Sequence, residues 1–507
     1  MKLAALALVA LIAFTTGASA APDTTEPVAR TDAGQVQGVA AKDTAAFKNI
    51  PYAAPPMGDL RWRPPQPAKA WTGVRPGDRY GAICTQIYNK TDNGVGALPM
   101  SEDCLSLNVW TPSLAPGAKA PVMVWIHGGG FVNGSGTAAL YDGAALARQG
   151  VVVVTINYRL GRFGFFAHPA LTKEAGGGPV ANYGLMDQIA ALEWVKRNIA
   201  TFGGDPDNVT IVGESAGGIS INRLMTAPPA QGLFHKAITQ SGLGGEQPLT
   251  LDKAEAAGFA FAASLGVSSE DPAALRALPA AAIIGAGDPN IADGFGPILD
   301  GRYVTGRVDA LFAAGKQAKV PYLVGSNALE VPWVSAAQPG AFAPFVNFPP
   351  TDLAAVRAAY PSEADYQHNL ISDLLFSEPA RFLARAQAAT GQPVYLYRFS
   401  VLSDPPPKGV TATPHAQERQ YVFRTLNTSP WPTTPNDEVQ AATASAYWVA
   451  FAKTGDPNGN GRPAWPRLLE GHDRLLNFTN AGAVTEAPSP PAALDAIERL
   501  QAASRGP

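Results

Sequence analysis

Cysteine and histidine are scarce in this chain of 507 residues, and its charges nearly balance. There are two cysteines and six histidines, and 38 Lys and Arg against 41 Asp and Glu leave a net charge of -3. Two cysteines without a histidine-rich cluster cannot form a zinc site, and the charge balance lacks the basic excess that binds nucleic acid. Because 46% of the residues are hydrophobic and 16% are charged, we expect a globular protein with a large core.

Long hydrophobic runs are also missing after the first 20 residues. Lys2 precedes an apolar stretch over residues 3–14, and Ala18-Ser19-Ala20 offers small side chains for cleavage. We therefore predict that residues 1–20 are a signal peptide and that residues 21–507 form a single domain in the periplasm or the medium. No later apolar run is long enough to cross a membrane, so the mature chain is expected to be soluble.

The two cysteines lie close together in the sequence, at Cys84 and Cys104. In an exported protein such a pair is expected to form a disulfide, although two free buried thiols are the alternative. Closing a loop of this size stabilises a fold by roughly 3 kcal/mol in the chain-entropy model.

Apolar runs and helical periodicity alternate along the middle of the chain. Residues 121–126 and 151–156 are continuous apolar runs of the kind found in buried parallel strands. Between the strands, apolar residues at spacings of three and four predict a helix over residues 186–200. Alternating strands and helices predict an α/β fold with a doubly wound, mostly parallel sheet. Further strands are predicted at residues 209–213, 236–240, 322–324 and 394–399, edge hairpins at 28–47, helical excursions at 252–284 and 351–389, and a closing helix at 439–453.

One stretch carries a G-x-S-x-G motif between a strand-like and a helix-like segment. Residues 209–218 read Val-Thr-Ile-Val-Gly-Glu-Ser-Ala-Gly-Gly. In this context the motif predicts a sharp turn that holds Ser215 at a helix N-terminus, clear of its neighbours. Gly213 and Gly217 are then required because a Cβ at either position would collide with the adjoining strand or helix. Ser215 is thus a candidate nucleophile, and an ordinary Gly/Ser turn is the alternative.

A serine nucleophile needs a histidine as its base. His415 lies in a Pro/Thr-rich loop after the predicted strand at 394–399, which is where hydrolases with this turn place their histidine. We expect the other five histidines to be structural or exposed: His127, His168, His235, His368 and His472.

The base in turn needs a carboxylate that orients it. The chain order of nucleophile, acid and histidine places this carboxylate between residues 215 and 415. Glu330, which follows the strand predicted at 322–324, is the candidate. Asp293, Asp300 and Asp404 remain alternatives, and any one of them is equally explained as a solvated loop charge.

Acyl transfer also requires hydrogen-bond donors for the developing oxyanion. His127-Gly128-Gly129-Gly130 follows the buried strand at 121–126, so its side-chain-free amides are expected to approach a substrate oxygen. The amide of Ala216, directly after the nucleophile, supplies a further donor. A flexible turn is the alternative reading of the glycines.

With these residues in place the sequence resembles the type-B carboxylesterases, the family of α/β-hydrolase fold that includes cholinesterases and bacterial p-nitrobenzyl-type esterases. The resemblance runs from about residue 28 to about residue 466. The motifs that carry it are residues 102–110, 127–131, 182–188 and 202–206, the turn at Ser215, Gln240-Ser241-Gly242 and residues 451–457.

The resemblance implies a role for each candidate residue. It implies Ser215, Glu330 and His415 as the catalytic residues of one domain over residues 21–507. It also implies oxyanion donors at Gly129, Gly130 and Ala216, and the Cys84–Cys104 bond. Glu214, Ser241 and Glu418 match positions that in the family form a buried polar network behind the histidine.

The sequence departs from the family pattern at three places. Leu329 and Val331 flank the acid where the family usually has Asp and Gly, and Ala416 follows the histidine in place of Gly. The loop between the cysteines contains Tyr88 but no tryptophan. Cholinesterases bind choline through a tryptophan in this loop, so its absence argues against a quaternary ammonium substrate.

The sequence therefore predicts a serine ester hydrolase that works through an acyl-enzyme and needs no cofactor or metal. The same residues would serve a hydrolase of carbamates, amides or bulky natural-product esters. A catalytically silent binding protein is the alternative from another class. Phe131, Phe295 and Trp333 are candidates for the substrate pocket, with ordinary core packing as their alternative reading.

Overall fold

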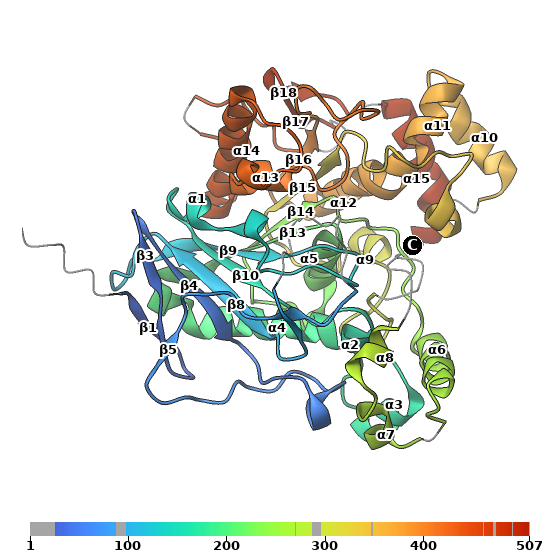
Figure 1. The fold of residues 1–507 in the computed structure, drawn as a ribbon. Helices are drawn as coiled ribbons and strands as arrows, with labels where there is room; N and C mark the ends of the chain where they lie inside the picture. The colour runs from blue at the N-terminus through green and yellow to red at the C-terminus, as the bar shows by residue number, and fades with distance from the viewer. Residues whose placement is uncertain are drawn as a thin grey trace, which may run out of the picture.

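The computed structural model describes residues 26–87, 98–268, 270–285, 296–345, 348–459, 461–469, 473–488 and 490–505. Within these residues the largest sheet has eleven strands (Figure 1). Their spatial order is β18 (Gly482–Glu486), β17 (Leu475–Thr479), β16 (Val394–Phe399), β15 (Tyr322–Asn327), β14 (Lys236–Gln240), β13 (Gly204–Glu214), β9 (Ala120–Ile126), β10 (Val152–Ile156), β8 (Ser106–Thr111), β4 (Thr44–Pro51) and β3 (Val39–Ala41).

The sheet is parallel in its centre and antiparallel at both edges. Every pair from β17 to β10 in this order is parallel, whereas β18 pairs antiparallel with β17, and β8, β4 and β3 continue antiparallel on the other side. The expected α/β fold with a mostly parallel sheet is confirmed. The apolar run at 151–156 belongs to β10, which is parallel to β9 but antiparallel to β8, because burial on both faces makes a strand apolar whatever the direction of its neighbours.

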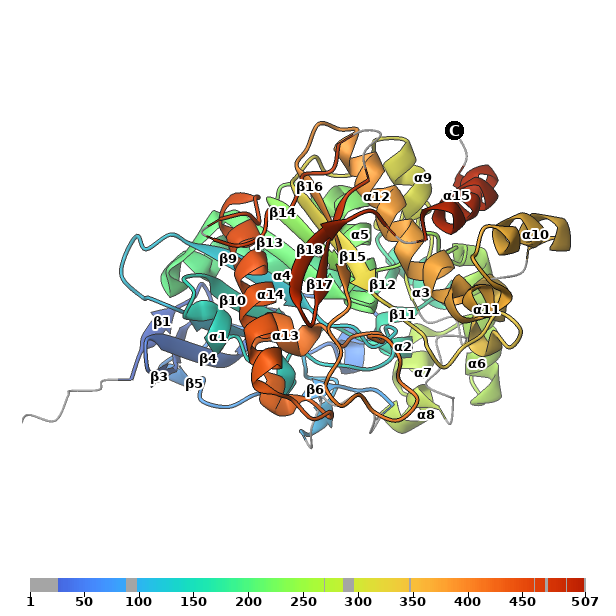
Figure 2. The same ribbon diagram turned by 90° about the horizontal axis from the view of Figure 1, so that it is seen from above.

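Helices cover both faces of the sheet, and each face has its own core. In β9, Val122, Val124 and Ile126 pack on one face, and Met123 and Trp125 pack on the other, as the period of two along a strand requires. The first face is covered by α4 (Tyr183–Asn198), α5 (Ala216–Thr226), α9 (Val308–Ala313) and α12 (Glu378–Ala388), and the second by α1 (Ala144–Ala147), α13 (Arg419–Phe423) and α14 (Pro435–Thr454) (Figures 1 and 2).

Two groups of helices lie outside these layers, on the same side of the molecule in Figure 1. The first group matches the helical excursion predicted at 252–284, and the second contains most of the one predicted at 351–389. The first consists of α6 (Leu251–Ser264), α7 (Pro272–Arg276) and α8 (Ala280–Ile284), near α2 (Gly161–Gly164) and α3 (Pro169–Ala175). The second consists of α10 (Pro350–Ala358), α11 (Glu363–Ser372) and a π-helical turn, η7 (Asp373–Ser377), that joins α11 to α12.

The C-terminal helix α15 (Pro491–Arg505) was not expected from the sequence. It packs beside α10 and α12 in both views (Figures 1 and 2). Leu494, Ile497 and Leu500 recur at helical spacing and contribute to buried or partly buried positions. This spacing is the signal that would have revealed the helix. No helix within the described ranges is both long and apolar enough to span a bilayer.

Short strands complete the N-terminal part of the chain. The hairpins expected at 28–47 divide between two sheets, because β1 and β2 pair with a later strand whereas β3 and β4 join the large sheet. Among the described residues the small sheets are β1 (Val28–Arg30), β2 (Gln35–Gln37) and β5 (Val74–Pro76); β6 (Ile83–Cys84) and β7 (Met100–Ser101); and β11 (Phe165–Phe166) and β12 (Ala181–Asn182).

Cys84 and Cys104 form the disulfide that the sequence indicated, with an S–S distance of 2.00 Å. Both cysteines are buried, at the β6–β7 sheet and just before β8. The bond therefore ties an irregular N-terminal segment to the start of β8 in the large sheet.

Replacing both cysteines by serine is expected to lower the free energy of unfolding by about 3 kcal/mol, since the bond restricts the unfolded chain. Thermal unfolding of the wild type and the double variant, each with and without reductant, measures this. Reductant should lower the Tm of the wild type alone. Equal melting temperatures for the two oxidised proteins would contradict the expectation.

Candidate active site

Ser215 lies in the turn between β13 and α5, in a backbone conformation that side chains rarely adopt. Its φ is 56° and its ψ is -124°. Its amide donates to the carbonyl of Gln240 on β14, with an N···O distance of 2.9 Å. A non-glycine residue at positive φ is strained, and such strain persists only where the surrounding structure enforces it. The turn therefore has the geometry that the G-x-S-x-G motif predicts.

The two glycines of the motif allow β13, α5 and β9 to approach closely. A Cβ on Gly217 would lie 2.0 Å from the carbonyl oxygen of Ile126, and a Cβ on Gly213 would lie 2.5 Å from the backbone of Gly217. Both contacts are with backbone atoms that cannot rotate away. Any side chain at either position would thus force the turn that carries Ser215 away from the sheet.

Ser215, His415 and Glu330 form a continuous chain of hydrogen bonds. His415 Nε2 is 2.8 Å from Ser215 Oγ, and His415 Nδ1 is 2.6 Å from Glu330 Oε2. A carboxylate can only accept, so Nδ1 carries the proton and Nε2 is left to accept from the serine hydroxyl. The structure thus brings together three residues that the sequence had singled out from distant segments.

Glu330 is fully buried and held from several directions. Its Oε1 accepts from the hydroxyl of Ser241 at 2.7 Å and from the amide of Asn327 at 2.6 Å. The amide of His415 donates to the Glu330 carbonyl at 2.9 Å, so the acid and base segments are also joined through their backbones. Leu329 and Val331, which depart from the family pattern, are buried apolar neighbours and remove neither hydrogen bond.

The two competing carboxylates that the structure describes, Asp300 and Asp404, form no hydrogen bond with His415 within the described residues. Asp300 accepts from the amides of Arg302, Tyr303 and Val304 and so stabilises a turn. Asp404 is exposed, and Asp293 lies outside the described residues.

Two more buried carboxylates surround the histidine. Glu214 Oε1 is 3.3 Å from His415 Nε2, and Glu214 Oε2 is 3.8 Å from the guanidinium of Arg419. Glu418 accepts from the side-chain amides of Gln240 at 2.9 Å and Asn327 at 2.7 Å. Gln240 is held in turn by the indole N–H of Trp448, which donates to it at 2.9 Å.

Burial and the neighbouring charges shift the pKa values of these groups. Burial raises the pKa of Glu214 to about 7, against the opposing effect of Arg419 and His415. Burial also raises the pKa of Glu418, and the charge of Glu330 adds to this effect. For His415, burial lowers the pKa, but the charge of Glu214 and the hydrogen bond to Glu330 outweigh it and raise the pKa to about 9.

The glycine loop after β9 lies directly against the serine. A Cβ on Gly128 would be 2.9 Å from Ser215 Cβ. Gly129 and Gly130 have φ values of 106° and 60°, and a Cβ on Gly129 would be 2.2 Å from the carbonyl oxygen of Asn133. Only glycine fits this path.

The amide of Ala216 opens α5, where the first N–H groups of a helix have no acceptor in the helix itself. The glycine loop, through Gly128, and the N-terminus of α5 therefore both lie beside Ser215. Such an arrangement is suited to binding an oxyanion.

The histidines assigned to structure have structural contacts. The ring of His127 stacks on Tyr158 with centroids 4.5 Å apart, and the Tyr158 hydroxyl donates to the His127 carbonyl at 2.9 Å. His168 and His235 each accept from a backbone amide at 3.1 Å, and His168 thereby caps α3. His472 lies outside the described residues.

The three pocket candidates fare differently. Phe131 is 5% exposed and packs edge-on against Phe165, with ring centroids 5.1 Å apart. Trp333 is 69% exposed, which is unlike a pocket residue, and Phe295 lies outside the described residues. Sequence reasoning missed Phe376, whose ring centroid is 5.2 Å from that of His415, because nothing in the pattern around it indicates which side chain it contacts.

Comparison with known proteins agrees with this arrangement of the fold. Residues 25–347 and 354–492 match the carboxylesterase family. The fumonisin B1 esterase of Sphingopyxis macrogoltabida is 39% identical, over 92% of this chain and 89% of that protein. The para-nitrobenzyl esterase of Bacillus subtilis is 37% identical, over 88% of this chain and 93% of that protein.

Solved structures give the same result. A thermophilic PNB esterase superposes with a TM-score of 0.83 at 34% identity, covering 93% of this chain and 100% of the other. The carboxylesterase of Geobacillus stearothermophilus superposes with a TM-score of 0.79 at 33% identity, covering 93% and 99%. With the whole fold and most of the sequence matched, this chain belongs to the carboxylesterase family and is a carboxylic ester hydrolase.

Proposed function

We propose that this carboxylic ester hydrolase uses Ser215 as its nucleophile, His415 as its base and Glu330 as the carboxylate that orients the base. The observation that supports the proposal is the hydrogen-bonded chain from Ser215 Oγ through both nitrogens of His415 to Glu330, at 2.8 Å and 2.6 Å. In such a chain the imidazole accepts the hydroxyl proton while the carboxylate stabilises the imidazolium that results.

The reaction has two steps. Ser215 Oγ attacks the ester carbonyl carbon as its proton passes to His415 Nε2, and the amides of Gly129, Gly130 and Ala216 donate to the oxyanion. His415 then gives its proton to the leaving alcohol, and an acyl-enzyme remains on Ser215. Water repeats the sequence with the same proton transfers and releases the acid. Each oxyanion donor typically lowers the barrier by about 2.7–4 kcal/mol.

Glu214 has a distinct role in this scheme. Its Oε1 lies 3.3 Å from His415 Nε2, which has no proton to donate while it accepts from Ser215. Once Nε2 takes the serine proton, Glu214 becomes a second carboxylate beside the imidazolium and stabilises its charge. Ser241 and Asn327 act on Glu330 and not on the histidine. They hold the carboxylate oxygen of Glu330 that does not face His415.

We further propose that the enzyme is exported, on the evidence of residues 1–20, and that its substrates are carboxylic esters without a quaternary ammonium group. The relatives named for fumonisin B1 and p-nitrobenzyl esters leave both bulky natural-product esters and small synthetic esters as candidates. Rates on p-nitrophenyl acetate and on fumonisin B1, measured side by side with the purified enzyme, distinguish these two classes.

Ser215→Ala is expected to lower kcat for p-nitrophenyl acetate by at least about 10⁴-fold, as loss of a nucleophile does in other serine hydrolases. A fluorophosphonate probe should label the wild type at Ser215 and leave the variant unlabelled. Circular dichroism and Tm, unchanged in the variant, serve as the control for folding. Residual turnover within tenfold of the wild type would sink the assignment of the nucleophile.

Glu330→Gln is expected to lower kcat by about 10⁴-fold, because an amide facing Nδ1 stabilises the wrong tautomer of the imidazole. Steady-state kinetics on p-nitrophenyl acetate measures the loss. Glu438→Gln, an exposed glutamate on α14, is the matched control and should leave kcat unchanged. If both variants retain wild-type kcat, Glu330 is not the orienting carboxylate.

The pH dependence of kcat/KM follows from the pKa of His415. Only neutral imidazole can accept the serine proton, so activity is lost as the pH falls through this pKa. Because neighbouring carboxylates raise the pKa of His415 above its usual 6.5, the acid limb should lie above pH 6.5. Glu214→Gln removes one of these charges and should move the acid limb to lower pH.

Glu174→Gln, a glutamate that pairs with Arg63 and Arg276 away from the site, is the control for the pH profile. It should leave the acid limb in place. An acid limb that does not move in the Glu214 variant would show that Glu214 does not influence the base.

A further inference from the structure

A π-helical turn packs against the candidate base. The turn η7 carries Phe376, which is 7% exposed and whose ring lies 5.2 Å from the imidazole of His415, centroid to centroid, at an angle of 54°. The two nitrogens of His415 are fixed by Ser215 and Glu330, but hydrogen bonds in the ring plane do little to stop the ring from tilting. The ring of Phe376 packs beside the imidazole, on a side that neither hydrogen bond restrains.

The same segment also contacts the strand-to-acid connection. Ser372, the last residue of α11 before the turn, accepts from the amide of Val331 at 3.2 Å. Val331 directly follows Glu330, so this hydrogen bond holds the backbone immediately after Glu330. Phe376 and Val331 belong to one buried apolar cluster with Ile371. One helical segment thus contacts both the base and the residue after the acid.

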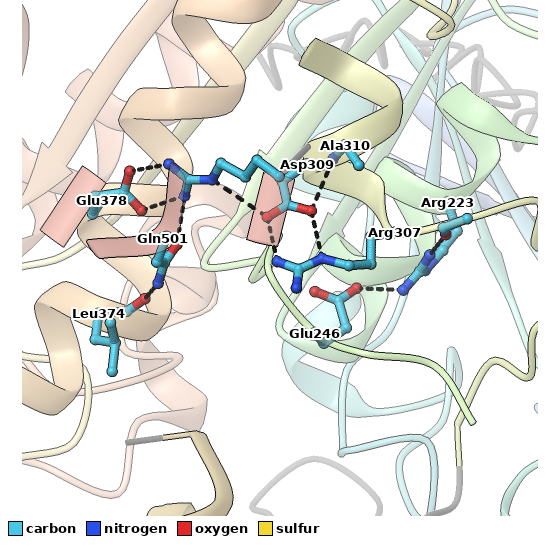
Figure 3. A network of polar contacts seen from close by, with 10 residues as sticks. Arg223, Glu246, Arg307, Asp309, Ala310, Leu374, Glu378 and Gln501 are labelled. Carbon is cyan, nitrogen blue, oxygen red and sulfur yellow. Dashed lines mark hydrogen bonds and ion pairs between the residues drawn. The ribbon is translucent and has the colours of Figure 1, made fainter. Parts of the chain in front are cut away.

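Side chains of the C-terminal helix α15 form hydrogen bonds with this turn and with the residue after it (Figure 3). The side-chain amide of Gln501 donates to the carbonyl of Leu374, inside the π-helical turn, at 3.3 Å. Arg505 donates to Gln501 Oε1 at 2.5 Å and to both carboxylate oxygens of Glu378 at 2.8 Å and 2.7 Å. Glu378 directly follows the turn. Gln501 of α15 therefore binds a residue within the turn, and Arg505 of α15 binds the residue at its end.

Arg505 continues into a wider buried ionic network. Its Nε donates to Asp309 on α9 at 3.3 Å, and Asp309 also accepts from Arg307 (Figure 3). The side chain of Arg505 is 4% exposed and that of Glu378 is fully buried. A shift of α15 would leave buried charges without partners, which is costly. The network therefore fixes where α15 sits and, through Gln501 and Glu378, where the π-helical turn sits.

We propose that Phe376 is a positioning residue for His415, and that α15 holds the π-helical turn that presents it. The proposal rests on the proposed role of His415 as the base. π-helical turns are rare within helices and are often found at functional sites. Here the turn does not touch the reacting atoms; it sets the orientation of the ring that must transfer a proton between Ser215 and the leaving group.

The first test compares Phe376→Leu with Phe202→Leu. Phe202 is a buried phenylalanine that packs on Phe47 at the other end of β13, so it controls for loss of a core ring. Phe376→Leu should lower kcat for p-nitrophenyl acetate roughly 10- to 100-fold, because small misplacements of a catalytic group have effects of this size. KM should stay within about twofold, since uniform substrate binding is untouched. Phe376→Tyr, which keeps the ring, should restore most of kcat.

A second readout separates orientation from packing. His415 faces the carboxylates of Glu214, Glu330 and Glu418, which are buried with it. If the ring loosens from these partners, the acid limb of kcat/KM should move to lower pH in Phe376→Leu and stay in place in Phe202→Leu. An unchanged kcat and acid limb in Phe376→Leu, or a raised KM with wild-type kcat, would overturn the proposal.

The role of α15 in holding the π-helical turn is tested with Gln501→Glu. This variant keeps the acceptor for Arg505 but removes the donor to Leu374. Its control is Gln387→Glu on α12, which removes a buried donor to the carbonyls of Ala318 and Val320. We expect Gln501→Glu to lower kcat several-fold at unchanged KM, and Gln387→Glu to lower Tm without lowering kcat. Equal kcat values for the two folded variants would overturn the role of α15.

Failure of this proposal is distinguishable from failure of the proposed function. If the wild type is labelled by a fluorophosphonate at Ser215 and Ser215→Ala is inactive, the assignment of the nucleophile stands whatever the Phe376 variants do. If the wild type is not labelled, the assignment of the nucleophile fails before any positioning effect can be measured.

Discussion

Three carboxylates buried around one imidazole are the constraint on which the rest of the site depends. Glu214, Glu330 and Glu418 are each almost completely buried. A buried charge without partners destabilises a fold by several kcal/mol, so each carboxylate needs donors in fixed places. The donors come from separate segments: the hydroxyl of Ser241, the amide groups of Asn327 and Gln240, and the imidazole of His415. The guanidinium of Arg419 forms a longer ion pair with Glu214. The fold must hold all of these segments at once.

The parallel strands make this possible, because their carboxyl ends meet at one edge of the sheet. Glu214 at the end of β13 is paired in register with Gln240 of β14, and Gln240 is paired with Gly325 of β15. The residues that follow these strand ends therefore emerge side by side: Ser215 after β13, Ser241 after β14 and Glu330 after β15. Sites at this edge are the rule for open α/β sheets. The strand order, more than any local motif, determines which distant residues can meet.

The sequence predicted the central strands and many of the helices, but it missed α15 and did not predict the contacts between elements. Particular residues show why. The turn at Ser215 is locally encoded, since Gly213 and Gly217 are required by backbone atoms close by. His415 and Glu330 follow strands, so chain order and family resemblance singled them out as candidates. Gln240, by contrast, matters because the indole of Trp448, from a distant helix, holds its orientation. Trp333 showed the opposite limit: an aromatic residue close to Glu330 in sequence points into solvent. Side-chain direction in a loop depends on tertiary packing that spacing does not encode.

The molecule contains a buried ionic cluster at the site and another where Arg505 of α15 meets Glu378 and Asp309. The same energetic argument applies to both, but their roles differ. Replacing a buried ion pair with apolar residues is often neutral or stabilising, whereas removing one partner is strongly destabilising. Arg505 with Glu378 and Asp309 is therefore better explained as a device that fixes one packing arrangement than as a source of net stability. An apolar contact would let α15 slide by a fraction of a turn at small cost, whereas a bidentate arginine would not. The helix α15 can in this way influence the geometry beside His415, the proposed base, whose placement matters because small misplacements of a catalytic group are costly.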